Sequence, residues 1–189
     1  SDSAWITADK IIPLIADFDP EVEHKGKQII VGLDLAASRD LLAKVCLVRT
    51  GEKKISRLDS ITGEVEEVEE PTYDVWLEAW TPRDTLQARE KTDRAPYSLW
   101  ADQGYLYAVS GQLVKRADVV RRLRNDDETY HIQGISYDRY AFDTFADEME
   151  TQGLEVPSFE HPQGGSRKSY LPDDNGETGR WSTVKNEEG

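Results

Sequence analysis

The sequence has few of the features that define several common classes of protein. One cysteine in 189 residues provides no disulfide framework, which suits a reducing compartment. Cys46 lies among apolar neighbours, so we expect a buried and inert thiol. There is no signal-peptide pattern and no apolar run near the roughly 20 residues that cross a bilayer. We therefore expect a soluble, intracellular protein without a membrane partner. Since Met149 is the only methionine, we expect a piece of a longer chain.

Basic residues are also in short supply. Lysine and arginine number 23 against 37 acidic residues, a net charge of −14, which excludes a chain that wraps nucleic acid with its whole surface. The charge is segregated, because five glutamates lie within residues 64–70 while a short segment further on is basic. Each run can be plain solvated surface, but on a helix the basic one can also contact phosphates. The candidate DNA-binding residues are Lys115, Arg116, Arg121, Arg122 and Arg124.

The apolar patterns that are present predict an α/β protein. Residues 28–35 are almost continuously apolar and β-branched, as expected for a strand covered on both faces, and residues 73–80 alternate with the period of a strand. The polar stretch 51–71 predicts an extended hairpin or a loop. Further strands are predicted at 41–48, 132–138 and 154–159, and helices at 84–92, 95–103, 115–124 and 139–151.

This order of elements resembles the ribonuclease-H-like fold. Three consecutive strands are followed by helices, a strand, a helix and a last strand, which predicts a mixed five-stranded sheet of order 3-2-1-4-5 flanked by helices. In that order strand four lies parallel beside strand one. We expect a connecting segment at residues 1–28, the folded domain at 29–162 and an irregular tail at 163–189.

Two aspartates end the two strands that this order makes neighbours. Asp34 and Asp138 would lie near the carboxyl ends of strands about 4.8 Å apart, where carboxylates can share a cation such as Mg²⁺ or Mn²⁺. A pair of such ions hydrolyses phosphodiesters by activating water and stabilising the leaving oxygen. Asp40, just past the strand, is either an additional ligand or an ordinary turn residue. For Asp34 and Asp138 the alternative is a strand-end aspartate that accepts from backbone donors.

Motifs along the chain resemble the nuclease domain of the large subunit of tailed-phage terminases. They include the segments 32–35, 80–82, 96–97, 104–106, 137–138 and 163–164, together with Arg89 and Asp93. The resemblance implies a metal-dependent endonuclease that cuts concatemeric viral double-stranded DNA in the bacterial cytoplasm, working with a terminase small subunit and a portal. It makes Asp34 and Asp138 catalytic metal ligands and Asp40 a further ligand. The sequence has no phosphate-loop motif, so residues 1–28 would lead from a missing packaging ATPase.

A third acid that the family carries near its C-terminus has no clear counterpart here. Asp173 and Asp174 stand in a context typical of a turn. For the divergent tail we expect one of three origins: a frameshift, a decayed prophage copy or truncation. The alternative function is therefore a catalytically impaired prophage remnant or docking module that keeps the fold. A resolvase or recombinase of the same fold is a further alternative.

Overall fold

The computed structural model describes residues 6–35, 41–58, 62–137, 142–160, 168–172 and 179–183. Most of the chain forms one α/β domain built on a six-stranded sheet. The strands are β1 Gln28–Asp34, β2 Leu42–Leu58, β3 Val65–Pro82, β4 Tyr107–Val109, β5 His131–Tyr137, β6 Ser158–Glu160, β7 Lys168–Pro172 and β8 Gly179–Thr183. The helices are α1 Ala8–Ile11, η1 Ile12–Leu14, α2 Pro20–His24, η2 Arg83–Thr85, α3 Leu86–Asp93, α4 Tyr97–Asp102, α5 Arg116–Thr129 and α6 Phe142–Thr151.

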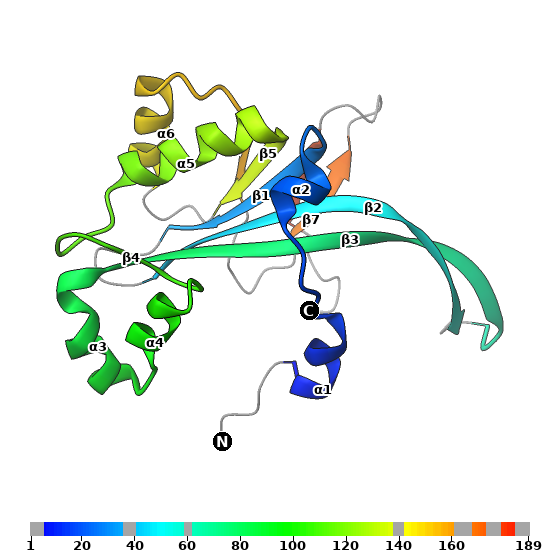
Figure 1. Cartoon of the computed structure of the whole chain (residues 1–189). Helices are drawn as coiled ribbons and strands as arrows, with labels where there is room; N and C mark the ends of the chain where they lie inside the picture. Colours follow the sequence, from blue (N-terminus) through cyan, green and yellow to red (C-terminus); the bar gives the residue numbers. More distant parts are fainter. Residues whose placement is uncertain are drawn as a thin grey trace, which may run out of the picture.

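The strands of the large sheet follow the order β4-β3-β2-β1-β5-β6 (Figure 1). β1 pairs antiparallel with β2 and parallel with β5, as the ribonuclease-H-like order requires. The predicted order 3-2-1-4-5 is thus confirmed as β3-β2-β1-β5-β6, and the short strand β4 adds a sixth member beside the end of β3. A second, two-stranded sheet of β7 and β8 lies within the tail that was expected to be irregular.

One face of the sheet carries the main core. Along β1, Ile29, Val31 and Leu33 are buried and pack with Leu123 of α5 and Phe145 of α6. Leucines, valines and aromatics at helical spacing on α5 and α6 make this packing possible, because the apolar side chains share one stripe of each helix. Figure 1 shows both helices on the same side of the sheet.

The opposite face is only partly covered. A smaller core that includes Ala79, Leu86 and Tyr97 shows that α3 and α4 cover its β3–β4 end. Elsewhere six large apolar side chains are at least 38% exposed, and we call this set the open face. It consists of Ile30, Val45, Tyr73, Val75, Leu77 and Phe159. The prediction that the first strand is covered on both faces is therefore wrong within the described residues, since β1 alternates between buried and exposed positions.

β2 and β3 continue beyond the sheet as a long two-stranded arm (Figure 1). The pairing runs without a break from Gly51 with Thr72 to Leu58 with Val65, so the polar stretch is a hairpin, one of the two predicted forms. The acidic run of residues 64–70 lies on this arm, where most side chains are exposed. None of the helices in the described part of the chain is long and apolar enough to cross a membrane.

Candidate metal site at the carboxyl end of β1

Asp34 is the last residue of β1, and its side chain is exposed on the open face. Its register partner on β2 is Ala43, which in turn pairs with Ala79 of β3. Small neighbours leave room around the carboxylate. Within the described residues Asp34 makes no side-chain hydrogen bond or ion pair, so its oxygens are available to a cation. A hard divalent ion takes such oxygen ligands.

The neighbouring strand on the other side is β5, parallel to β1 as predicted. Leu33 pairs with Tyr137, the last described residue of β5. Asp138 follows directly in the sequence but lies outside the described residues, as does Asp40. The structure therefore brings together the two strands that carry the predicted pair of aspartates, and it describes one of the two carboxylates.

Glu160, at the end of β6, is a nearby acid that the register excludes from this site. It pairs with Tyr137, which pairs with Leu33. Paired residues of a parallel sheet point to the same face, and Leu33 is buried beneath the helices. Glu160 thus belongs to the face opposite Asp34. No group of three or more His, Cys, Asp or Glu side chains that could hold an ion occurs among the described residues, so no third ligand is identified.

The basic segment forms the first half of α5, which lies on the covered face. Lys115 and Arg116 lie at the start of α5. Because α5 runs along the sheet and is followed directly by β5, its start lies near the carboxyl ends of β1 and β5. Lys115, Arg116, Arg121 and Arg124 are exposed. They are free to meet phosphates, although Arg121 also pairs with Asp118 at 3.0 Å.

Arg122 has a different environment from the other basic residues. It donates two hydrogen bonds to Glu78 Oε1 and one to Oε2, the shortest of them 2.6 Å. Its Nε also lies 3.6 Å from a carboxylate oxygen of Asp126. Arg122 therefore fastens α5 to β3, a structural role that the sequence pattern did not show.

Lys44 completes this buried network, which sequence analysis missed. Its side chain is fully buried, and its Nζ lies 2.6 Å from Glu78 and also contacts Asp126. Burial alone would lower the pKa of Lys44, but Cys46, Asp126 and Glu78 together outweigh burial and leave the pKa above its usual value. Burial raises the pKa of Asp126, whereas hydrogen bonds from Arg122 and Lys44 overcome burial at Glu78 and lower its pKa.

Cys46 and two tryptophans of β3 have structural roles. Cys46 is buried, and burial raises its pKa to about 12, which confirms the prediction of an inert thiol. Trp80 is buried and stacks on Tyr107, while Trp76 lies in an aromatic cluster with Tyr130.

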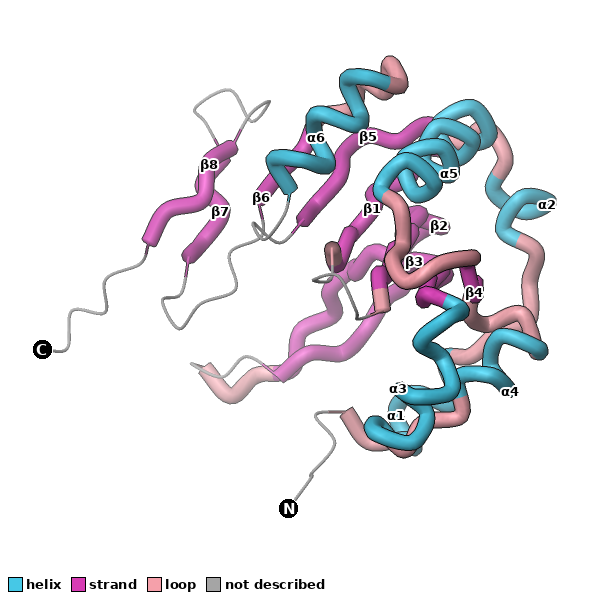
Figure 2. Tube along the Cα trace, turned by 90° about the vertical axis from the view of Figure 1, so that its left-hand side faces the viewer, coloured by secondary structure: helices cyan, strands magenta, loops and turns pink. Residues whose placement is uncertain are grey.

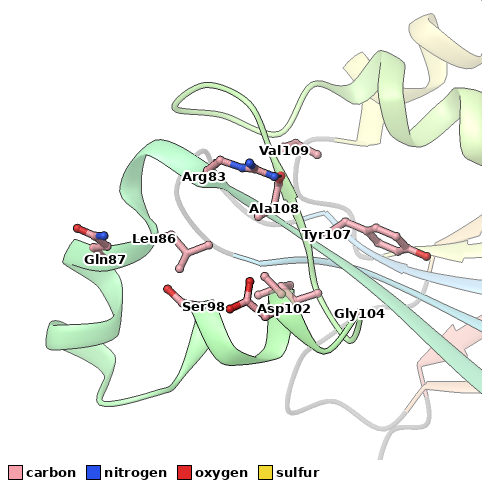
Figure 3. A pocket seen from close by; sticks show the side chains of 11 residues that line it. Arg83, Leu86, Gln87, Ser98, Asp102, Gly104, Tyr107, Ala108 and Val109 are labelled. Atoms are coloured by element: carbon pink, nitrogen blue, oxygen red, sulfur yellow. Dashed lines mark hydrogen bonds between the residues drawn. The ribbon is translucent and has the colours of Figure 1, made fainter.

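A pocket of about 560 Å³ lies beside β4 and does not include Asp34 (Figure 3). Arg83 lines it and donates to the Ala108 carbonyl oxygen at 3.0 Å, and Ser98 and Asp102 of α4 contribute polar atoms. Asp102 is the single carboxylate of its lining. With one oxygen ligand of this kind the pocket is a poor candidate for a metal-dependent site.

The strand order, with β5 parallel to β1, is that of a ribonuclease-H-like α/β protein, and Asp34 is an aspartate at the end of β1. A family model described as the terminase large subunit, endonuclease domain, matches residues 5–170. The chain is 33% identical over 133 residues to the terminase large subunit of Enterobacteria phage HK97, covering 70% of this chain and 23% of that protein. The crystal structure of the HK97 bacteriophage large terminase is similar with a TM-score of 0.57 at 30% identity, covering 75% of this chain and 26% of that one.

The chain therefore belongs to the family of terminase large-subunit endonuclease domains. It spans about a quarter of the length of the HK97 protein that it matches. The resemblance that the sequence motifs suggested is confirmed.

Proposed function

We propose that this chain is the DNA-cleaving domain of a viral genome-packaging terminase and acts on double-stranded DNA in the cytoplasm of a bacterial host. The observation that carries this is the exposed carboxylate of Asp34 at the end of β1, which has no partner among the described residues and lies directly beside the parallel strand β5. Family membership supports the nuclease role. As in the family, a terminase small subunit and a portal would be its partners.

In this proposal Asp34 and Asp138 hold one or two Mg²⁺ or Mn²⁺ ions, and Asp40 is an additional ligand. Asp138 follows Tyr137, the partner of Leu33, so the two aspartates come at the same end of neighbouring parallel strands in the sequence. The bound ions would supply the charge that activates water and stabilises the leaving oxygen. Asp34 would hold the ions at the carboxyl end of β1.

The exposed lysine and arginine side chains of α5 would bind the DNA beside the carboxyl ends of β1 and β5. Lys115 and Arg116 are nearest to these ends along the helix, and Arg121 and Arg124 extend the basic surface away from them. Contacts to phosphates position DNA without reading its sequence. Arg122 takes a smaller part, because its guanidinium already binds Glu78.

The test is nicking of supercoiled plasmid in the presence of Mn²⁺ or Mg²⁺. Replacing Asp34 or Asp138 by Asn should lower the rate at least about 100-fold, since a metal site is worth several kcal/mol in the transition state. Asp147→Asn is the matched control, because Asp147 is an exposed aspartate of α6 on the covered side of the sheet. Equal nicking by the parent and Asp34→Asn would refute the assignment of the site.

A second candidate function is a docking module that binds DNA or a packaging partner without cutting. It is favoured by the lack of three clustered metal-ligating side chains within the part of the chain that the structure describes. In the same assay it predicts that the parent and all three variants are equally inert. Retained DNA binding in a gel-shift measurement would then distinguish a docking module from a misfolded protein.

A further inference from the structure

The open face is an apolar surface that runs across several strands. In one row of register partners, Leu77 of β3 pairs with Val45 of β2, and Val45 pairs with Gly32 of β1. Leu77 is 60% exposed and Val45 is 38% exposed. Contiguous exposed apolar patches on a folded domain mark surfaces that another element covers.

A second group of exposed apolar side chains lies near the N-terminus of the described chain. The segment 6–15, which we call the strap, carries five of them, each at least 39% exposed and none in either core. They are Ile6, Ile11, Ile12, Leu14 and Ile15. The strap and the open face thus both expose apolar side chains whose burial would stabilise the protein.

The chain between these two surfaces is short and firmly anchored. Phe18 packs edge-on against Trp76 with ring centroids 6.4 Å apart, and His24 Nε2 lies 2.9 Å from Asp74. Trp76 and Asp74 belong to the covered side of β3, where Trp76 packs against Tyr130 after α5. Their sequence neighbour Val75 points to the open face. The anchor therefore lies directly behind the apolar patch.

The strap leaves this anchor toward the open face. Figures 1 and 2 show the chain passing from α2, on the side of α5, along the β3 edge of the sheet to α1 on the side of α3 and α4. Residues 15–17 span about 10 Å when extended, which is the thickness of one layer of packing. The strap is thus tethered within reach of Val75 and Leu77, and such tethering gives a high effective concentration.

We infer that the strap docks on the open face of its own chain, with Leu14 and its apolar neighbours covering Tyr73, Val75 and Leu77. Asp34 on β1 is one row of side chains beyond Leu77 and two strands across from it, so a docked strap lies on the same face as Asp34, beside it. The docked strap would therefore line the approach to Asp34. Docking itself needs no bound metal and no DNA cleavage, so it can fail or succeed independently of the nuclease function.

Paired cysteines in the full chain test this docking. Leu14→Cys with Val75→Cys should form an intramolecular disulfide under mild oxidation, at least about tenfold faster than Val22→Cys with Val75→Cys. Val22 is a suitable control because it is 76% exposed but belongs to α2, on the other side of the sheet. Cys46 can remain in place, since it is fully buried.

The products are separated by non-reducing electrophoresis and intact mass. A fast intramolecular disulfide in the Leu14 pair alone supports docking. Disulfides between two chains would indicate that a second copy covers the open face. Equal rates of disulfide formation in both cysteine pairs would indicate that a different partner covers it. Either result overturns the inference. Dye binding gives a second measurement that needs no cysteine: Leu14→Asp should increase the fluorescence of a dye for apolar surfaces, and Val22→Asp should not.

Discussion

Replacing Lys44 by Met tests whether the buried network holds α5 on the sheet. Met fills a similar volume but has no charge, so Glu78 and Asp126 lose the lysine ammonium that both contact and keep Arg122. Glu78 keeps its hydrogen bonds from Arg122, the shortest 2.6 Å. Asp126 is 2% exposed, and among the described residues its remaining charged partner is the guanidinium of Arg122, at 3.6 Å. The cost of the substitution is therefore concentrated on Asp126.

Removing one partner of a buried ion pair costs about 3–5 kcal/mol. Because Arg122 still lies near Asp126, we expect the lower end, about 3 kcal/mol at pH 7. With a urea dependence of about 2 kcal/mol per molar, the unfolding midpoint should fall by roughly 1.5 M. Urea unfolding followed by tryptophan fluorescence measures this shift. Lys54→Met is the control, an exposed lysine of the same strand, and should change stability by less than about 0.5 kcal/mol.

The loss of stability in Lys44→Met should also depend on pH, in a direction that can be predicted. Burial already raises the pKa of Asp126 in the folded state, and loss of Lys44 should raise it further. A folded-state pKa above the unfolded value means that stability is regained as the pH falls through it. The difference between parent and Lys44→Met should therefore shrink from pH 7 to pH 5. A variant within about 1 kcal/mol of the parent at pH 7, or a difference that grows on acidification, would refute the reasoning.

Two further predictions concern the strand beside the site and the basic helix. An added Cβ at Gly134 would lie 2.7 Å from Cε2 of Phe159, so Gly134→Ala should destabilise the fold by about 1–2 kcal/mol. In a Phe159→Ala background the same substitution should cost much less. Equal costs in both backgrounds would exclude this contact as the cause. Arg124→Gln should lower the affinity for double-stranded DNA and reduce its salt slope by about one without changing stability, whereas Arg122→Gln should lower the urea midpoint by freeing Glu78. Unchanged binding of DNA by Arg124→Gln would remove this residue from the proposed contact surface.

The fold was largely predictable because it depends on the order and period of apolar residues. The parallel placement of the strands that end at Asp34 and Tyr137 followed from the sequence of elements alone. The network around Lys44 did not, because its partner Asp126 lies 82 residues away and either residue reads as ordinary surface by itself. The three-residue strand β4 is too short to produce a recognisable period.

The uncovered face of β1 shows a different limit of sequence patterns. Ile30 is apolar, as a strand covered on both faces requires, yet it is 44% exposed. Apolarity predicts that a side chain will be covered, but it does not say which segment covers it. In the same way, the position of Asp34 predicts cation binding without naming the remaining ligands.

These two open questions meet on one surface, because Ile30, Gly32 and Asp34 follow one another along the same face of β1. Register decides which groups can reach an ion at Asp34: Glu160 cannot, since it pairs with Tyr137 on the covered face. The further proposed ligands, Asp138 and Asp40, follow β5 and β1 in the sequence, whereas a segment over Leu77 and Val45 would lie one row of side chains away from Asp34. A segment that covers the apolar residues of the open face therefore borders Asp34 without having to bind its ion, and it determines how water and DNA reach the carboxylate from that face.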